Sequence, residues 1–335
     1  MISFSTTRRR TIAAFATLLS IVTLVGGLQP PAAAPFTFAP IDVPGAVATG
    51  GLGVNDAGDV VGVSSDATDN FGGFVRSGGM FTPIAVPGAL FASPIDINNT
   101  GDIVGTFLDA TGRMHGFLLR GGAFTTIDFP GAGATALLGI NDGSQIVGTF
   151  NVGPILDAVG RRGFLLSAST FTPIDVPGAD VTSANGINNA GQIVGTFGSL
   201  AEGVVHTFFL DEGRFSQIDV PGVASPPPGT AVSGPGTQGF GINTAAQIAG
   251  FFTDTAGVHG FVLDEGRFTR IDVDLPGTGS TQVTGINDAG QLVGIFGDAA
   301  APGHGFLATP VPEPSTFMLA ISALGLVYRF ARRKK

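Results

Sequence analysis

One pattern of twelve residues, GINDAGQLVGIF at residues 285–296, recurs along the chain and constrains the fold more than any other feature. The asparagines that mark its six copies are separated by 43, 43, 47, 55 and 44 residues, mostly in or near the range of propeller-type repeats. A period of this length indicates that one small structural unit is built six times. The other copies begin at Gly53, Asp96, Gly139, Gly186 and Gly241.

Each unit is interpreted as four short strands joined by three turns. Segments rich in Val, Ile, Phe and Thr are typical of strands, and Asn-Asp or Asn-Asn followed by Gly is typical of tight turns, because Asn and Gly tolerate positive φ. The 53 glycines and 22 prolines agree with an all-β fold, since both residues are unfavourable inside helices. In the second unit the expected strands are residues 92–97, 102–107, 115–119 and 124–129.

The ends of the repeated region predict how it closes. A four-stranded sheet cannot bury both faces alone, so neighbouring units must stack, and six of them form a ring. The region begins with a lone fourth strand, residues 38–43, and ends with residues 285–306, which hold three strands and no fourth. The first strand is expected to complete the last blade and so protect the sheet edges. The sequence therefore predicts an all-β, six-bladed β-propeller over residues 36–308.

Residues 1–34 have the features of a signal peptide: a basic head at Arg8, Arg9 and Arg10, an apolar run over residues 12–25, and a stretch of small residues. A retained membrane helix is the alternative. The chain has no cysteine, so an exported protein of this sequence must be held together by its core and by ring closure. We expect export, with the cleavage position left open.

The C-terminal residues 309–335 combine three features in order. Pro312, Glu313 and Pro314 precede an apolar run over residues 317–328, and a basic cluster ends the chain at residues 329–335. This order resembles the PEP-CTERM sorting tail of Gram-negative bacteria. The resemblance implies an exosortase-type processing enzyme as partner, transient insertion of a short transmembrane helix in the inner membrane, and then release or attachment at the cell surface. An ordinary C-terminal membrane anchor is the alternative.

Half of the basic residues lie at the two ends of the chain. Without Glu313 and the basic groups at residues 8–10 and 329–335, the remainder has 8 basic and 24 acidic side chains and no lysine. Such an acidic body repels nucleic acid and anionic lipid. Nucleic acid is therefore not expected as a partner, whereas cations and polyhydroxylated ligands are favoured.

The repeats also resemble HAF-type extracellular repeats through the sequence HGF at residues 115–117, 259–261 and 304–306. The resemblance covers residues 36–308 and implies no activity or site. The chain has four histidines, at equivalent positions of different units, so we expect them to hydrogen-bond or pack rather than meet at one zinc ion. Neither a Gly-x-Ser-x-Gly element nor a cysteine is present to serve a catalytic triad. The histidines are His115, His206, His259 and His304.

Acidic residues recur in two further places. The turns at Asn55 and Asn98 faintly resemble calcium loops, but they lack the spacing and the bidentate glutamate of such loops. No cofactor is expected, with calcium as the alternative. Aspartates also recur just before Pro-Gly turns, where we expect each side chain to bond the backbone of its own turn. These residues are Asp42, Asp128, Asp175, Asp219 and Asp272.

Loop lengths differ between the two faces of the expected propeller. Connections between strands one and two, and between three and four, share one face and are uniformly short. Large length differences fall on the other face, at residues 151–162, 198–205 and 223–239. Loops on a rigid scaffold commonly carry binding sites, so we place the candidate site there, near the central channel; neutral drift of exposed loops is the alternative. The candidate residues are Asp157, Arg161, Arg162, Glu202, Pro226, Pro227 and Pro228.

Together these features predict a non-enzymatic propeller, at the cell surface or in the extracellular matrix, that binds polysaccharide or a surface protein. One alternative is a polysaccharide hydrolase or lyase, which needs two carboxylates about 5–10 Å apart. The non-repeated acids Asp157, Asp180 and Glu202 are available for this role, and no pair stands out. The other alternative is a structural spacer of a surface layer or biofilm without a specific ligand.

Overall fold

The computed structural model describes residues 36–68, 70–153, 156, 160–199, 203–223, 236–275, 279–297 and 303–311. The expected signal peptide, the motif Pro312, Glu313 and Pro314, and the apolar tail lie outside these residues, so the statements about them stay predictions. Within the described ranges, no helix has the length and hydropathy needed to span a membrane.

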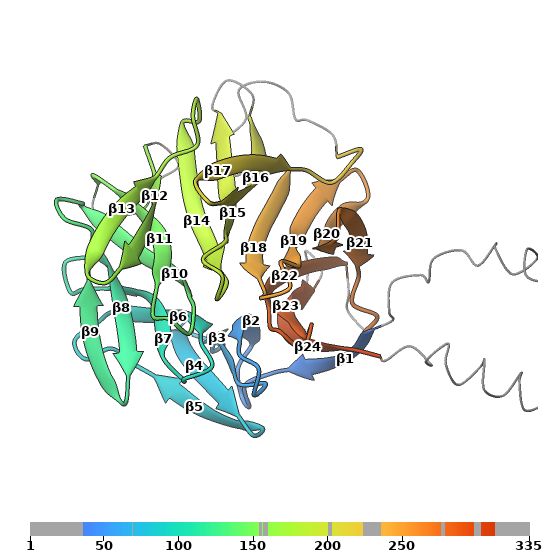
Figure 1. Cartoon of the computed structure of the whole chain (residues 1–335). Helices are drawn as coiled ribbons and strands as arrows, with labels where there is room; N and C mark the ends of the chain where they lie inside the picture. Colours follow the sequence, from blue (N-terminus) through green and yellow to red (C-terminus); the bar gives the residue numbers. More distant parts are fainter. Residues whose placement is uncertain are drawn as a thin grey trace, which may run out of the picture. The chain divides into compact units, whose positions relative to one another are not determined.

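The described residues form six antiparallel sheets of four strands, arranged as blades around a central axis (Figure 1). This arrangement confirms the six-bladed, all-β prediction. Blade 1 consists of β2 (Ala48–Val54), β3 (Val60–Ser65), β4 (Phe71–Ser77) and β5 (Met80–Ile84). Blade 2 consists of β6 (Phe91–Ile97), β7 (Ile103–Leu108), β8 (Met114–Arg120) and β9 (Ala123–Ile127). Blade 3 consists of β10 (Ala134–Ile140), β11 (Ile146–Asn151), β12 (Arg162–Ser167) and β13 (Thr170–Ile174). Blade 4 consists of β14 (Val181–Ile187), β15 (Ile193–Ser199), β16 (Val204–Asp211) and β17 (Arg214–Ile218). Blade 5 consists of β18 (Thr237–Ile242), β19 (Ile248–Asp254), β20 (Gly257–Asp264) and β21 (Arg267–Ile271). Blade 6 consists of β22 (Ser280–Ile286), β23 (Leu292–Gly297), β24 (His304–Pro310) and β1 (Phe36–Ile41).

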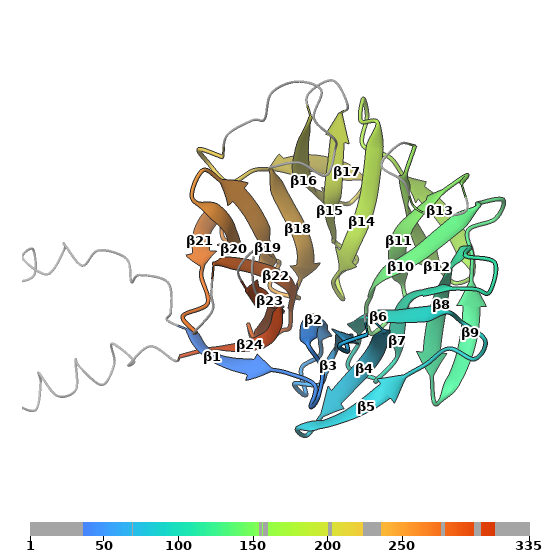
Figure 2. The same cartoon turned by 180° about the vertical axis from the view of Figure 1, so that it is seen from behind.

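The first strand completes the last blade, as predicted. β1 pairs antiparallel with β24, from Phe36 opposite Pro310 to Ile41 opposite Gly305. The two strands lie side by side in both views, β1 in blue and β24 in red (Figures 1 and 2). β1 lies two residues earlier than the expected strand, because the chain already turns at Val43, whose carbonyl accepts a hydrogen bond from Ala46 N at 3.0 Å.

Each blade has a phenylalanine of its third strand packed on a glycine of its second. In blade 3, the fully buried Phe164 lies opposite Gly148, and a β carbon on that glycine would come within 2.1 Å of the Ala136 carbonyl oxygen. The same Gly–Phe pairing recurs in all six blades. Further clusters fill the space between blades, as where Val147 of blade 3 packs in one core with Phe208 of blade 4. The repeated VGTF and HGF segments therefore form the core.

The six asparagine turns bind one another in a closed ring. In each, Oδ1 accepts a hydrogen bond from the backbone N–H four residues later, as Asn141 does from Gln145 at 2.9 Å. Asn141 Nδ2 also donates to the carbonyl of Asn188 in the next blade at 3.0 Å. Six equivalent inter-blade bonds of 2.9–3.4 Å close the circle. We call this side the Asn-turn face and the opposite side the long-loop face. The ring residues are Asn55, Asn98, Asn141, Asn188, Asn243 and Asn287.

Candidate functional site: the central channel

The innermost strand of every blade contains a β-bulge, which lies between Leu137 and Gly139 in β10. Bulges re-aim a side chain, and here the residue omitted from each ladder lines the channel. The repeat thus fixes the backbone around the channel but leaves six channel-lining side chains free to vary. They are Leu52, Ile95, Leu138, Asn185, Phe240 and Thr284.

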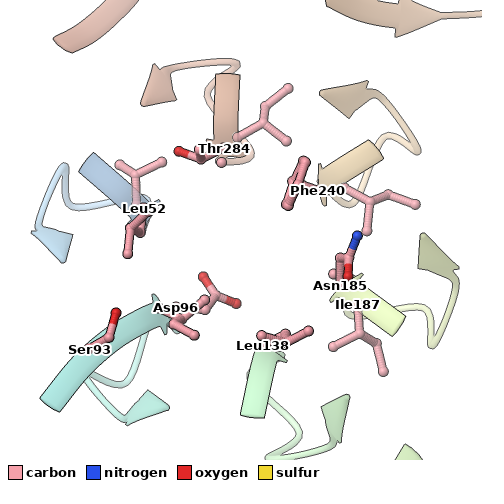
Figure 3. Close-up of a pocket in the computed structure, with 15 residues that line it drawn as sticks. Leu52, Ser93, Asp96, Leu138, Asn185, Ile187, Phe240 and Thr284 are labelled. Carbon is pink, nitrogen blue, oxygen red and sulfur yellow. The ribbon is translucent and has the colours of Figure 1, made fainter. Parts of the chain in front are cut away.

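The centre of the channel is a chamber of about 250 Å³ with a mainly apolar wall (Figure 3). Two of its polar side chains are bound to the surrounding backbone. Asn185 Nδ2 donates to the Gly239 carbonyl at 2.8 Å, and Thr284 Oγ1 donates to the Gly51 carbonyl at 2.8 Å. We call this cavity the inner chamber.

Asp96 places a carboxyl group in the inner chamber, and Figure 3 shows it pointing toward the channel centre. Its Oδ1 accepts a hydrogen bond from Ile97 N, and its Oδ2 accepts one from Ile140 N of the next blade, both at 2.9 Å. A β carbon on Gly53 would lie 2.9 Å from Asp96 Oδ1, so the glycine of blade 1 makes room for the carboxyl. Burial raises the pKa of Asp96 to about 7, against the lowering effect of the two hydrogen bonds.

Asp96 was missed by the sequence analysis, although the repeat contained the signal. The residue two positions before the ring asparagine is glycine in five units and aspartate only in the second. A Cβ on Gly186 would come within 2.4 Å of the Phe240 carbonyl, so this position is crowded by the next blade. A carboxylate at a crowded glycine position is a departure from the repeat that only a comparison of units, position by position, would detect.

The Asn-turn mouth carries a second ring of polar side chains, each one residue after a ring asparagine, and all of them are exposed except the half-buried Asp142. Asn99 Nδ2 donates to Asp56 Oδ2 at 2.8 Å and to Asp142 Oδ2 at 3.0 Å. Burial acts to raise the pKa of Asp142, but hydrogen bonds from Asn99 and Asn189 outweigh it and hold the pKa below its usual value. The mouth is therefore acidic and highly ordered by its own hydrogen bonds. Its outer ring is Asp56, Asn99, Asp142, Asn189, Thr244 and Asp288.

A second cavity, of about 310 Å³, lies on the long-loop side between blades 3, 4 and 5; we call it the outer chamber. Leu138, Asn185 and Phe240 line both chambers, so the two adjoin. The outer chamber adds polar side chains, including the guanidinium of Arg161 and the amide of Gln238. It combines a cation, amides and hydroxyls with an aromatic ring in one concave surface.

The predicted site residues fall into three groups. Arg161 lines the outer chamber, and its carbonyl accepts a hydrogen bond from Thr182 N at 2.9 Å. Arg162 is exposed and forms an ion pair with Asp175 at 2.9 Å instead. Asp180, considered for the enzymatic alternative, is exposed. The remaining candidates lie outside the described residues: Asp157, Glu202, Pro226, Pro227 and Pro228.

The prediction for the aspartates before the Pro-Gly turns was wrong. Asp128 Oδ2 lies 2.7 Å from His115 Nδ1 on the neighbouring strand. The turn is satisfied otherwise, because Phe129 N donates to Thr135 Oγ1 of the next blade at 3.0 Å. His115 also stacks on Phe107 with ring centroids 5.1 Å apart, so the expectation that the histidines hydrogen-bond or pack is confirmed. The corresponding pairs are His206–Asp219, His259–Asp272, His304–Asp42 and, in blade 3, Arg162–Asp175.

In the part of the chain that the structure describes, no group of three or more His, Asp or Glu side chains is placed to hold a metal ion. In the turn compared with a calcium loop, Asp59 Oδ2 accepts a hydrogen bond from Asn55 Nδ2 at 3.3 Å. The absence of a cofactor stays a prediction.

The chain matches no known family profile and no curated protein. It is similar to solved structures. The lectin SapL1, solved with α-methyl fucoside, is 12% identical with a TM-score of 0.50, over 80% of this chain and 98% of that one. A lectin of Aleuria aurantia, described as a six-bladed β-propeller with a fucose recognition mode, is 12% identical with a TM-score of 0.48, over 85% and 100%. A subtype N10 neuraminidase-like protein of a little yellow-shouldered bat isolate is 10% identical with a TM-score of 0.49, over 82% and 98%. At these identities the likeness shows the propeller fold alone.

Proposed function

We propose that this protein is a non-enzymatic β-propeller that binds carbohydrate at the long-loop mouth of its channel. The observation that carries the proposal is the outer chamber, where Arg161 lies with Ser183, Gln238 and Phe240 in one wall. The protein is exported and sorted to the cell surface or matrix through its C-terminal tail, as the order of Pro-Glu-Pro, apolar run and basic cluster supports.

The chemistry of the outer chamber suits a sugar. A sugar ring presents many hydroxyl groups around an apolar carbon skeleton, so its binding site needs hydrogen-bonding side chains beside an apolar surface. Arg161 supplies a fixed fork of donors, and Gln238 supplies both a donor and an acceptor. Leu138 and Phe240 supply the apolar surface. A protein of the cell surface with an exposed polar segment is the alternative ligand for the same mouth.

Two adjacent arginines make the test specific. The full-length chain in detergent is screened on a glycan array that includes α-methyl fucoside, the ligand named for SapL1. The affinity for any glycan that binds is then measured by calorimetry. Arg161→Ala should weaken binding about tenfold or more, the cost of a lost hydrogen-bonded charge. The matched control Arg162→Ala, which breaks only the exposed pair with Asp175, should change affinity less than twofold.

Three outcomes count against this proposal. Equal effects of the two arginine substitutions would place the site elsewhere. Binding of none of the glycans, together with no protein captured from the host envelope, would favour a spacer. Release of new reducing ends from a bound polysaccharide would favour the hydrolase. Asp96 is the one carboxylate of the two chamber walls among the described residues, whereas the hydrolase needs two about 5–10 Å apart.

The sorting part of the proposal has its own measurement. Mass spectrometry of the mature protein from its native host should show that residues 1–34 and the apolar tail are absent. An intact C-terminus on membrane-bound protein would indicate an ordinary anchor instead.

A further inference from the structure

The wall of the inner chamber contains a half-buried acid and, among the described residues, no positively charged side chain. Asp96 lies among Leu52, Ile95, Leu138 and Phe240, in a cavity of about 250 Å³. Its two hydrogen bonds come from backbone N–H groups of Ile97 and Ile140, which leave further lone pairs of the carboxyl directed at the cavity. A carboxylate in such surroundings is stabilised by a cation beside it and is otherwise driven to its neutral form.

The route from the Asn-turn face to Asp96 is acidic. Asp96 lines both the inner chamber and the Asn-turn mouth, whose other carboxylates are Asp56, Asp142 and Asp288. Among the described residues of these two walls there is no lysine, arginine or histidine. The one cationic side chain on the described channel wall is Arg161, in the outer chamber. Negative charge at a narrow mouth concentrates cations there.

We propose that the inner chamber binds a small organic cation, whose ammonium group pairs with the Asp96 carboxylate while its alkyl part packs against Leu138 and Phe240. A metal ion fits this wall poorly, since it requires several oxygen, nitrogen or sulfur ligands and the surroundings of Asp96 are mainly aliphatic and aromatic. An alkylammonium ion satisfies both features, because one end carries the charge and the other is apolar. This site shares Leu138 and Phe240 with the proposed carbohydrate site, but its charged group is Asp96, whereas that of the carbohydrate site is Arg161.

Binding at this site is coupled to a proton. Because burial raises the pKa of Asp96 to about 7, the carboxyl is protonated in slightly acidic solution and ionised in alkaline solution. The ammonium ion needs the ionised form, so below pH 7 binding releases close to one proton to the solvent. Affinity should rise with pH through about 7 and level off above it. At the mouth, hydrogen bonds from Asn99 and Asn189 hold the pKa of the half-buried Asp142 below its usual value.

The test uses n-butylammonium, with n-butanol as the neutral probe of the same shape. Calorimetry on the full-length chain, repeated in two buffers of different ionisation enthalpy, measures affinity and protons released. Binding of n-butylammonium should be about tenfold or more tighter at pH 8.5 than at pH 5.5, whereas that of n-butanol should not depend on pH. Asp96→Gly, which restores the residue of the other five units, should weaken n-butylammonium about tenfold or more and leave n-butanol unchanged or tighter.

Two further variants protect the conclusion. Asp96→Asn keeps the size of the side chain and should lose the preference for the ammonium if charge decides it. Asp56→Asn removes an acid of the mouth and should reduce affinity less than threefold at 0.15 M salt, because exposed charges are screened. The proposal is overturned if the two probes bind alike, if neither binds at tens of millimolar, or if Asp96→Gly binds n-butylammonium as the wild type does. A change on Arg161→Ala would not affect it.

Discussion

The two mouths of the channel differ in how strictly they follow the repeat. At the Asn-turn mouth, all six units supply the same buried asparagine, and the six side chains form a closed ring of inter-blade hydrogen bonds. At the long-loop mouth, the inner strands of blades 4 and 5 place Ser183 and Gln238 in the wall of the outer chamber, at the position where blade 3 has the buried Ala136. The residues that join the blades are thus the same in every unit, whereas the residues of the candidate binding surface differ from unit to unit.

The comparison separates residues that hold neighbouring blades together from residues that only line the channel. A ring asparagine satisfies its own turn and the next blade at once, so a change in one unit would disturb two. A bulge residue such as Leu52 lines the inner chamber with an apolar side chain, and its replacement would chiefly disturb that cavity. Asp96 lies between these cases, because it lines the cavity and also accepts a hydrogen bond from Ile140 N of the next blade.

The largest expected effect is on the pH dependence of the unfolding free energy, and it comes from Asp96, the acid at a position where the other five units have glycine. A carboxyl whose pKa is raised on folding contributes stability that is complete below its unfolded pKa, near 3.8, and is lost as pH rises through about 7. The loss between pH 4 and pH 8 should reach roughly 4 kcal/mol. Asp96→Gly removes the group, so the difference in unfolding free energy between wild type and variant should shift by this amount. Urea unfolding followed by circular dichroism measures it at each pH.

The stability contributions of other acids change with pH in the opposite direction. The difference between wild type and Asp96→Gly is therefore measured, because contributions common to both proteins cancel. The pKa of Asp66 is lowered to about 2 by hydrogen bonds from Thr68 and Asn70, and the pKa of Asp219 is lowered by His206 and Gln217 against the effect of burial. Their stability contribution is present above the unfolded pKa and lost as pH falls. If wild type and Asp96→Gly lose stability in parallel from pH 4 to pH 8, Asp96 titrates normally and the channel is well solvated.

The second-largest expected change in unfolding free energy comes from a comparison of two asparagines in neighbouring turns, one buried and one exposed. Asn141→Ala should cost about 3 kcal/mol, because it leaves the half-buried Gln145 N–H and the buried Asn188 carbonyl without their partner. Asn189→Ala removes two exposed hydrogen bonds, one donated to the Asp142 carboxylate and one accepted from Asp142 N, and should cost less than about 1 kcal/mol. Chemical unfolding of both variants at pH 7 gives the comparison. Equal losses would show that the closed ring contributes no more than a surface hydrogen bond.

The fold could be predicted from the sequence because repetition averages out local ambiguity. Six copies of a turn such as Asn55 to Gly58 identify the strands on either side, and the missing fourth strand after His304 locates the closure. The strand ends were less certain. The expected strand 124–129 extends two residues past β9, because Asp128 pairs with His115 and Phe129 N bonds the next blade.

The candidate site was harder to predict, since its residues are departures from the repeat. The His–Asp pairs could have been inferred from joint variation: blade 3 has Arg162 opposite Asp175, and blade 1 has Gly72 together with Ala85. Asp96 gave a sharper signal, a single acid at a glycine position. The burial that raises its pKa is supplied by other blades, and no property of residues near Asp96 in the sequence indicates it.

The smallest expected change in stability concerns the residue with positive φ at the end of each asparagine turn. The last residue of each asparagine turn has a positive φ, and it is glycine in four units but Ser144 and Ala246 in the other two. Ala246 has φ 59°, a conformation that costs a non-glycine residue about 1 kcal/mol. Ala246→Gly should therefore stabilise the protein by about 0.5 kcal/mol, because greater freedom of the unfolded chain offsets part of the gain.

The reverse change in blade 4 provides the control for this last prediction. Gly191 has φ 82°, and a β carbon there would meet only Gln145 Oε1, at 3.9 Å, so Gly191→Ala introduces strain without a clash. It should destabilise the protein by about 1 kcal/mol, measured in the same urea titration. Opposite signs for the two substitutions would mean that backbone conformation sets the residue at this position. If both substitutions destabilise, blade 5 has adapted its packing to Ala246, and even the Asn-turn face varies by unit.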